Sequence, residues 1–181
     1  MNTGVISMRY AKALYAYAKE QEMDGAIYSN MLQLMHTLQH VKELGEVLAT
    51  PSLSADERVS LLCSAVDSSP VYERFMRLVV SRERESLLPF IAHCYVSLYR
   101  KKKNIIAMRF TTARPASDAV REKVIAAASR DGAEVEMHDV VEPDIIGGFI
   151  CETETHRLDA SVRRQLRDIE IELVKQNKKL A

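Results

Sequence analysis

Residues 142–153 read EPDIIGGFICET, and this stretch decides what kind of fold the second half of the chain can have. A phosphate-binding loop would need a helix directly behind the two glycines, so that free backbone N–H groups face the anion. The apolar FICET follows instead, which favours a strand. No Lys or Arg occurs between residues 134 and 155, whereas seven Asp and Glu do, so a phosphate would be repelled. We therefore interpret Gly147 and Gly148 as a structural pair that permits a bulge or a close backbone approach.

The pattern around this stretch changes near Asn104. Beyond it, residues 105–111 (IIAMRFT) alternate, which places Ile106, Met108 and Phe110 on one face of a strand. The segments that follow predict a helix capped by Ser117, strands over EVEMHDVV and GFICET, and a last helix from about Ser161 to the end of the chain. Residues 105–181 are therefore predicted to form a small α/β domain.

The residues before Asn104 show helical spacing and helical end signals. Two helices are predicted over about Thr3–Glu20 and Asp24–Gln39, and a short third one covers Val41 to Leu48. Three more follow: one with a capping box of Ser54 and Glu57, one with Pro70 in its first turn, and one with Pro89 near its start that ends in RKKKN. We predict an α+β protein with a six-helix bundle over residues 1–104.

The composition sets limits on where the chain works. Apolar residues make up 47% of its 181 residues, enough for a packed core, and its formal net charge is zero. Its three cysteines are widely spaced, which favours a reducing compartment over disulfides. The N-terminus has no signal-peptide pattern, and the longest nearly uncharged stretch is shorter than the roughly 18 residues that a membrane-spanning helix needs. We expect contact with a membrane only through a partner.

The residue types of catalysis and metal binding occur without the partners that such chemistry needs. His36 and His40 have helical i, i+4 spacing, but no third metal ligand is predictable nearby. Asp159 and Ser161 lie where the last helix should start, so we interpret them as its cap. The run RKKK at 100–103 lacks the aromatic residues of a nucleic-acid site. We predict no catalytic residue, no metal, no cofactor and no nucleic acid.

The first and fifth predicted helices are apolar around most of their circumference. Their charged residues, such as Arg9 and Lys12 on the first and Arg74 and Arg77 on the fifth, form narrow stripes. A surface helix needs an apolar arc of only a little over 100°. Either both helices lie deep in the bundle, or a groove between them accepts an amphipathic helix of another protein. The candidate groove residues are Tyr10, Ala13, Leu14, Tyr17, Phe75, Leu78 and Val79.

Three segments resemble the delta subunit of F-type ATP synthase, the bacterial relative of the mitochondrial oligomycin-sensitivity-conferring protein. They are RYAKALY at 9–15, FMRLVVSRERESLLPFI at 75–91 and EPDIIGGFICETETHRLDASVRRQL at 142–166. The last segment is the most specific, and Gly147, Gly148, Asp159 and Ser161 match its signature. The chain departs from the family pattern at Glu85, Glu154, Thr155, Ala160 and Arg164.

The resemblance implies a non-catalytic stator subunit that couples hydrogen ion transport to ATP synthesis at the cytoplasmic face of the bacterial inner membrane. It implies that residues 1–104 bind the N-terminal helix of an alpha subunit between the first and fifth helices. It also implies that residues 105–181 bind the peripheral-stalk b subunit. The alternative is an unrelated helical adaptor, or an interaction protein associated with nucleic acid through residues 100–103.

Overall fold

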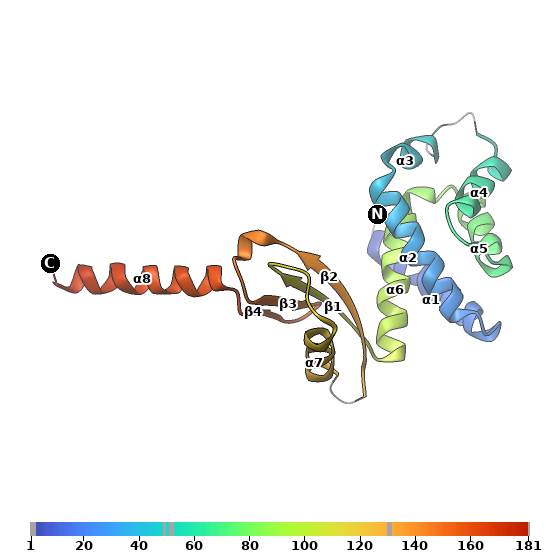
Figure 1. Cartoon of the computed structure of the whole chain (residues 1–181). Helices are drawn as coiled ribbons and strands as arrows, with labels where there is room; N and C mark the ends of the chain where they lie inside the picture. The colour runs from blue at the N-terminus through green and yellow to red at the C-terminus, as the bar shows by residue number, and fades with distance from the viewer. Residues whose placement is uncertain (1–2, 49, 51–52, 130–131, 181) are drawn as a thin grey trace. The chain divides into compact units, whose positions relative to one another are not determined.

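The protein has an α+β fold, as the sequence predicts (Figure 1). The computed structural model describes residues 3–48, 50, 53–129 and 132–180, and for residues 42, 43, 46 and 176–180 it describes only the backbone. The chain divides into two compact units, Met1–Lys102 and Lys103–Ala181. Each unit has buried residues of its own, so each is described by itself.

The first unit consists of helices whose starts follow from local signals. Ser54 and Glu57 form the expected capping box: the Ser54 backbone N–H donates to Glu57 Oε2 at 2.8 Å, and the Glu57 N–H donates to Ser54 Oγ at 3.3 Å. Ser69 caps the next helix, which has Pro70 in its first turn. The bounds are α1 Thr3–Glu20, α2 Asp24–His40, α3 Lys42–Leu48, α4 Ala55–Ser64, α5 Pro70–Ser81, the 3-10 helix η1 Glu85–Leu87 and α6 Leu88–Lys103.

One continuous apolar core joins α1 to α6. Its largest members include Tyr72 and Tyr95, which are both completely buried. Each hydroxyl finds an acceptor, because Tyr72 donates to the Leu62 carbonyl at 3.3 Å and Tyr95 donates to the Asp24 carbonyl at 3.1 Å. The two phenols therefore add apolar area to the core without leaving a buried polar group unsatisfied.

Glu85 departs from the family pattern, and the structure gives it a partner. Its carboxylate lies 3.0 Å from the guanidinium of Arg58, and both side chains are largely buried. Arg58 also donates to the Thr50 carbonyl at 3.3 Å. The ion pair thus links α4 to η1.

The second unit is a four-stranded mixed sheet with two helices. Its elements are β1 Ile105–Thr112, α7 Asp118–Ala128, β2 Glu134–Val141, the 3-10 helix η2 Pro143–Ile145, β3 Phe149–Thr153, β4 Arg157–Asp159 and α8 Val162–Leu180. The strand order is β2-β1-β3-β4. The first two strands are parallel because α7 connects them as a crossover, and the remaining pairs are antiparallel. The short β4, three residues long, was not predicted.

Gly147 and Gly148 lie where the chain passes close to the start of α8. Gly148 has a φ of +72°, and a Cβ added to it would overlap the carbonyl oxygen of Ala160. The Val162 N–H donates to the Gly147 carbonyl at 3.0 Å, and the Ala160 N–H donates to the Phe149 carbonyl at 2.9 Å. This is the kind of close backbone approach for which the sequence favours glycine.

Asp159 and Ser161 hold the beginning of α8. The Ser161 N–H donates to Asp159 Oδ1 at 3.1 Å, and the Arg164 N–H donates to Ser161 Oγ at 3.2 Å. Hydrogen bonds from Ser161 hold the pKa of the Asp159 carboxyl below its usual value. Both residues therefore cap the start of α8, as the sequence indicates.

A fragment of residues 1–104 should fold without the rest of the chain, because the described core of α1 to α6 consists of residues that lie inside it. We expect a helical circular-dichroism spectrum and a single cooperative thermal transition. The full-length chain, measured in the same buffer, is the control. A fragment that melts without a transition would contradict this division of the chain.

Candidate partner-helix groove

The structure buries one face of α1 and leaves another exposed. The buried face consists of Ser7, Ala11, Leu14 and Ala18, at the spacing of three and four residues that brings side chains to one side of a helix. On α5, the buried residues are Val71, Tyr72, Phe75, Met76, Val79 and Val80. Deep packing in the first unit therefore accounts for most of the apolar surface of both helices.

The seven residues of the predicted groove divide into three groups. Leu14, Phe75 and Val79 belong to the core. Tyr10 and Tyr17 are half-buried. The exposed members are Ala13 and Leu78, and the Leu78 side chain keeps 47% of its surface accessible.

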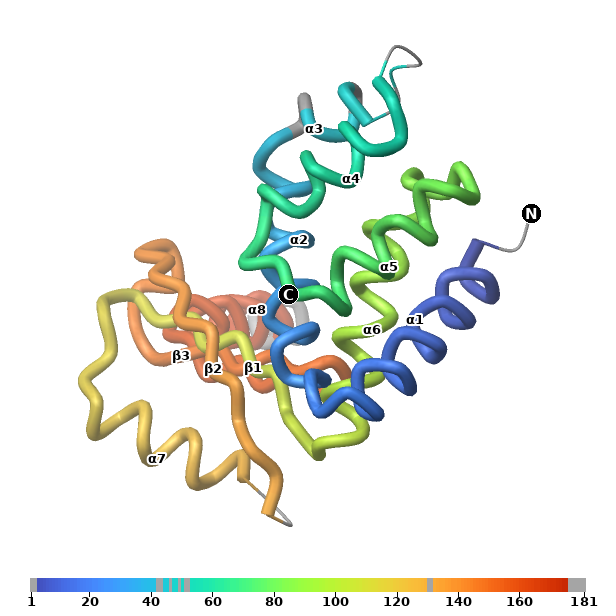
Figure 2. Tube along the Cα trace, turned by 90° about the vertical axis from the view of Figure 1, so that its right-hand side faces the viewer, coloured from blue at the N-terminus to red at the C-terminus, as the bar shows by residue number. Residues whose placement is uncertain are grey.

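Two arginines cover the tyrosines where α1 and α5 lie side by side (Figure 2). The Arg74 guanidinium lies 5.2 Å from the ring centre of Tyr17 and donates to its hydroxyl at 3.1 Å. The Arg84 guanidinium lies 5.9 Å from the ring centre of Tyr10, and this ring meets Phe75 edge-on at 6.4 Å. We define the α1–α5 surface as Tyr10, Ala13, Tyr17, Arg74, Leu78 and Arg84.

This surface is cationic. Among the described residues, neither Arg74 nor Arg84 forms an ion pair with a carboxylate. Arg77 differs, because it pairs with Asp56 at 3.0 Å and with Glu73 at 2.9 Å, and the Glu73 hydrogen bond raises its pKa. These two uncompensated arginines would attract a partner helix that carries carboxylates.

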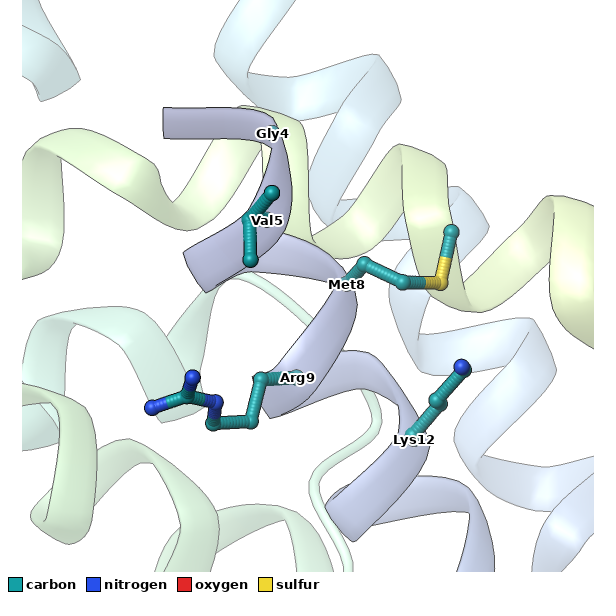
Figure 3. A pocket seen from close by; sticks show the side chains of 5 residues that line it. All are labelled: Gly4, Val5, Met8, Arg9 and Lys12. Atoms are coloured by element: carbon teal, nitrogen blue, oxygen red, sulfur yellow. The ribbon is translucent and has the colours of Figure 1, made fainter. Parts of the chain in front are cut away.

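A shallow hollow of about 430 Å³ lies elsewhere on α1 (Figure 3). Met8 and Lys12 project to one side of the helix and Arg9 to the other. None of its lining residues belongs to the α1–α5 surface. Its described lining residues are Gly4, Val5, Met8, Arg9 and Lys12.

The described part of the chain holds no group of three His, Cys, Asp or Glu residues placed to bind a metal ion. The rings of His36 and His40 stack at 4.0 Å, and His40 Nδ1 lies 2.8 Å from the His36 carbonyl. In the basic run at residues 100–103, Arg100 donates to the Tyr28 hydroxyl at 2.9 Å. Of the described helices, none is both long enough and apolar enough to cross a membrane.

The sequence did not indicate the contacts of Arg74 and Arg84 with the tyrosines. Tyr17 and Arg74 are 57 positions apart in the chain, and only the packing of α1 on α5 brings them together. In the sequence, only their positions could have pointed to these contacts: Arg74 lies on the apolar-rich fifth helix, and Arg84 lies just after it.

Comparison of the sequence with known proteins shows which family the chain belongs to. The family model described as ATP synthase delta (OSCP) subunit matches residues 6–173. ATP synthase subunit delta of Parabacteroides distasonis is 41% identical over 172 residues, covering 93% of this chain and 96% of that protein. ATP synthase subunit delta of Bacteroides fragilis is 38% identical over 185 residues, covering 99% of this chain and all of that protein.

A solved structure has a similar fold. It is a chain of the cryo-EM structure of the Toxoplasma gondii mitochondrial ATP synthase hexamer, with a TM-score of 0.68 and 20% sequence identity. The match covers 93% of this chain and 97% of the other. The shared fold therefore extends through both units.

Proposed function

Because this chain belongs to the ATP synthase delta (OSCP) subunit family, it is a stator subunit of F-type ATP synthase, and we propose how its two units work. Residues 1–104 form a six-helix bundle that binds the N-terminal helix of an alpha subunit. Residues 105–181 bind the peripheral-stalk b subunit. The chain holds the catalytic head against rotor torque and catalyses no reaction itself. It works at the cytoplasmic face of the membrane, which it reaches only through its complex.

The α1–α5 surface carries the proposal for the first unit. Ala13 on α1 and Leu78 on α5 are both exposed. The contacts of the half-buried Tyr17 and Tyr10 with Arg74 and Arg84 connect α1 to α5 and to the residues just after it. A small residue such as Ala13 lets another helix approach closely, while Leu78 offers it an apolar anchor. The uncompensated charges of Arg74 and Arg84 favour a partner helix with carboxylates beside its apolar stripe. Leu14, Phe75 and Val79 would support this surface from below.

Ala13→Trp should weaken the binding of a synthetic alpha-subunit N-terminal peptide by about tenfold or more, which corresponds to about 1.4 kcal/mol. The indole would fill the space that the partner backbone needs. Leu78→Asp should have a comparable effect, because it replaces the apolar anchor with a charge. Isothermal titration calorimetry on the full-length chain measures both.

Lys12→Trp is the matched control, because Lys12 is also exposed on α1 but, as the immediate neighbour of Ala13, it points about 100° away from Ala13 and away from Tyr10 and Tyr17. Its affinity should stay within about twofold of the unchanged chain. The assignment of the surface fails if Ala13→Trp and Leu78→Asp fold normally and still bind the peptide with unchanged affinity.

A further inference from the structure

Two histidines lie one helical turn apart on the exposed side of α2. His36 and His40 are both exposed, and their rings stack with centres 4.0 Å apart and planes at 23°. The opposite side of α2 is held in the core by its buried residues, which are Ile27, Tyr28, Asn30, Met31 and Leu34. The two rings therefore project in the same direction from one anchored segment of backbone, and both can be reached from solvent.

A hydrogen bond fixes which ring nitrogen of His40 is free. His40 Nδ1 lies 2.8 Å from the carbonyl oxygen of His36. Because a carbonyl only accepts, Nδ1 carries a proton, and the lone pair of the neutral ring is then on Nε2. Histidines that bind metals commonly have this arrangement, in which the second ring nitrogen donates to a backbone carbonyl and orients the ring. His40 is thus prepared to bind an ion through Nε2.

His36 supplies a second imidazole on the same side of the helix. Among the described residues, none forms a hydrogen bond with its ring nitrogens, so a lone pair is available there. Two histidines at i and i+4 have the spacing by which helices bind one ion with two imidazoles. No third protein ligand joins them within the described part of the chain. Water would therefore occupy the remaining coordination positions.

The ligand type indicates which ion fits. Imidazole nitrogens suit Zn²⁺, Ni²⁺ and Cu²⁺, whereas Mg²⁺ and Ca²⁺ prefer oxygen ligands. Zn²⁺ has no redox chemistry, so it suits the reducing compartment that the widely spaced cysteines favour. We propose that His36 and His40 together bind one Zn²⁺ ion at the end of α2 that leads into α3 (Figure 1). This site does not depend on the proposed function.

A helix cap is the other role open to His40. Its Nδ1–H donates to a carbonyl in the last turn of α2, where a histidine also interacts favourably with the helix dipole. A cap needs no second histidine. The ring of His36, stacked on that of His40, is the observation that favours an ion. The two roles therefore differ in what they require of His36.

Isothermal titration calorimetry of the full-length chain with Zn²⁺ tests the proposal. We expect one Zn²⁺ per chain and no binding of Mg²⁺, which is the control ion. His36→Gln and His40→Gln should each weaken Zn²⁺ binding by about tenfold or more, because one of the two protein ligands is lost. His36→Gln is the more informative variant, since it keeps the backbone carbonyl to which His40 donates and so leaves a cap intact.

His93→Gln is the matched control for the two substitutions. His93 is likewise exposed on a helix, α6, but no other histidine lies three or four positions from it. Its affinity for Zn²⁺ should stay within about twofold of the unchanged chain. NMR spectra of the imidazole nitrogens add a direct readout: Zn²⁺ should shift Nε2 of His40 and leave its Nδ1 protonated.

Four outcomes would overturn the proposal. If the unchanged chain does not bind Zn²⁺, the pair is only a cap and its neighbour. If neither His36→Gln nor His40→Gln weakens binding, the ion is held elsewhere, for example by the free cysteines. If only one of the two weakens it, a single histidine binds the ion. If half an ion binds per chain and analytical ultracentrifugation shows a zinc-dependent dimer, the ion joins two copies of this chain.

Discussion

Gly148→Ala should unfold the second unit under conditions in which the first unit stays folded. The added Cβ would overlap the carbonyl oxygen of Ala160, and the residue would also have to keep a φ of +72°. Neither backbone can move aside without losing the hydrogen bonds that join residues 147–149 to residues 160–162. We expect a loss of about 3 kcal/mol or more in the stability of the second unit. Amide hydrogen exchange, read separately for the two units, measures it.

Gly132→Ala is the matched control for this prediction. Gly132 has nearly the same φ, +71°, but nothing described lies within 4 Å of its added Cβ. Gly132→Ala should therefore lower the stability of the second unit only by the backbone cost of a positive φ, about 1 kcal/mol. Equal losses for the two variants would mean that conformation alone, and not the approach to Ala160, requires glycine at position 148.

Val79→Asp should destabilise the first unit by about 4 kcal/mol or more. Val79 is completely inaccessible inside the core, so the carboxylate would be buried without a partner. Leu78→Asp is the adjacent comparison. Its side chain keeps 47% of its surface accessible, and the stability should change by less than about 1 kcal/mol. Urea denaturation of the full-length chain, followed by the helical circular-dichroism signal, distinguishes the two.

The stabilities of the Val79→Asp and Leu78→Asp variants decide how the α1–α5 surface can be tested. If Val79→Asp unfolds the first unit, lost binding in that variant says nothing about a direct contact with an alpha helix. Leu78 and Ala13 are then the positions whose substitution reports on binding alone. A Val79→Asp chain that stays as stable as the Leu78→Asp chain would show that α5 packs differently from the structure described above.

Local signals in the sequence determined where most elements begin and end. The capping box of Ser54 and Glu57 and the proline in the first turn of α5 fix helix starts because they satisfy or remove backbone donors at that end. The alternation in residues 105–111 and the apolar FICET after the glycine pair likewise identified two strands, β1 and β3. These inferences succeeded because each depends on neighbours only a few residues away.

The family motifs could also be recognised in the sequence alone. The segment at 142–166 carries the pattern by which the chain was assigned, and the match over residues 6–173 agrees with that assignment. The short β4 was missed, because three residues between a turn and a helix start show too little periodicity to predict a strand.

Only the tertiary structure decided which side of each apolar helix is buried. Helical periodicity shows that Leu14 and Ala13, or Val79 and Leu78, point in different directions, but it does not show which direction meets the rest of the core. The packing of α1 on α5 made that choice, and it also placed Arg74 on Tyr17, 57 positions away. In the same way, the need for glycine at position 148 comes from the Ala160 carbonyl, which the folded chain alone brings near. Burial and contact depend on residues far apart in the chain, and a local pattern carries no information about them.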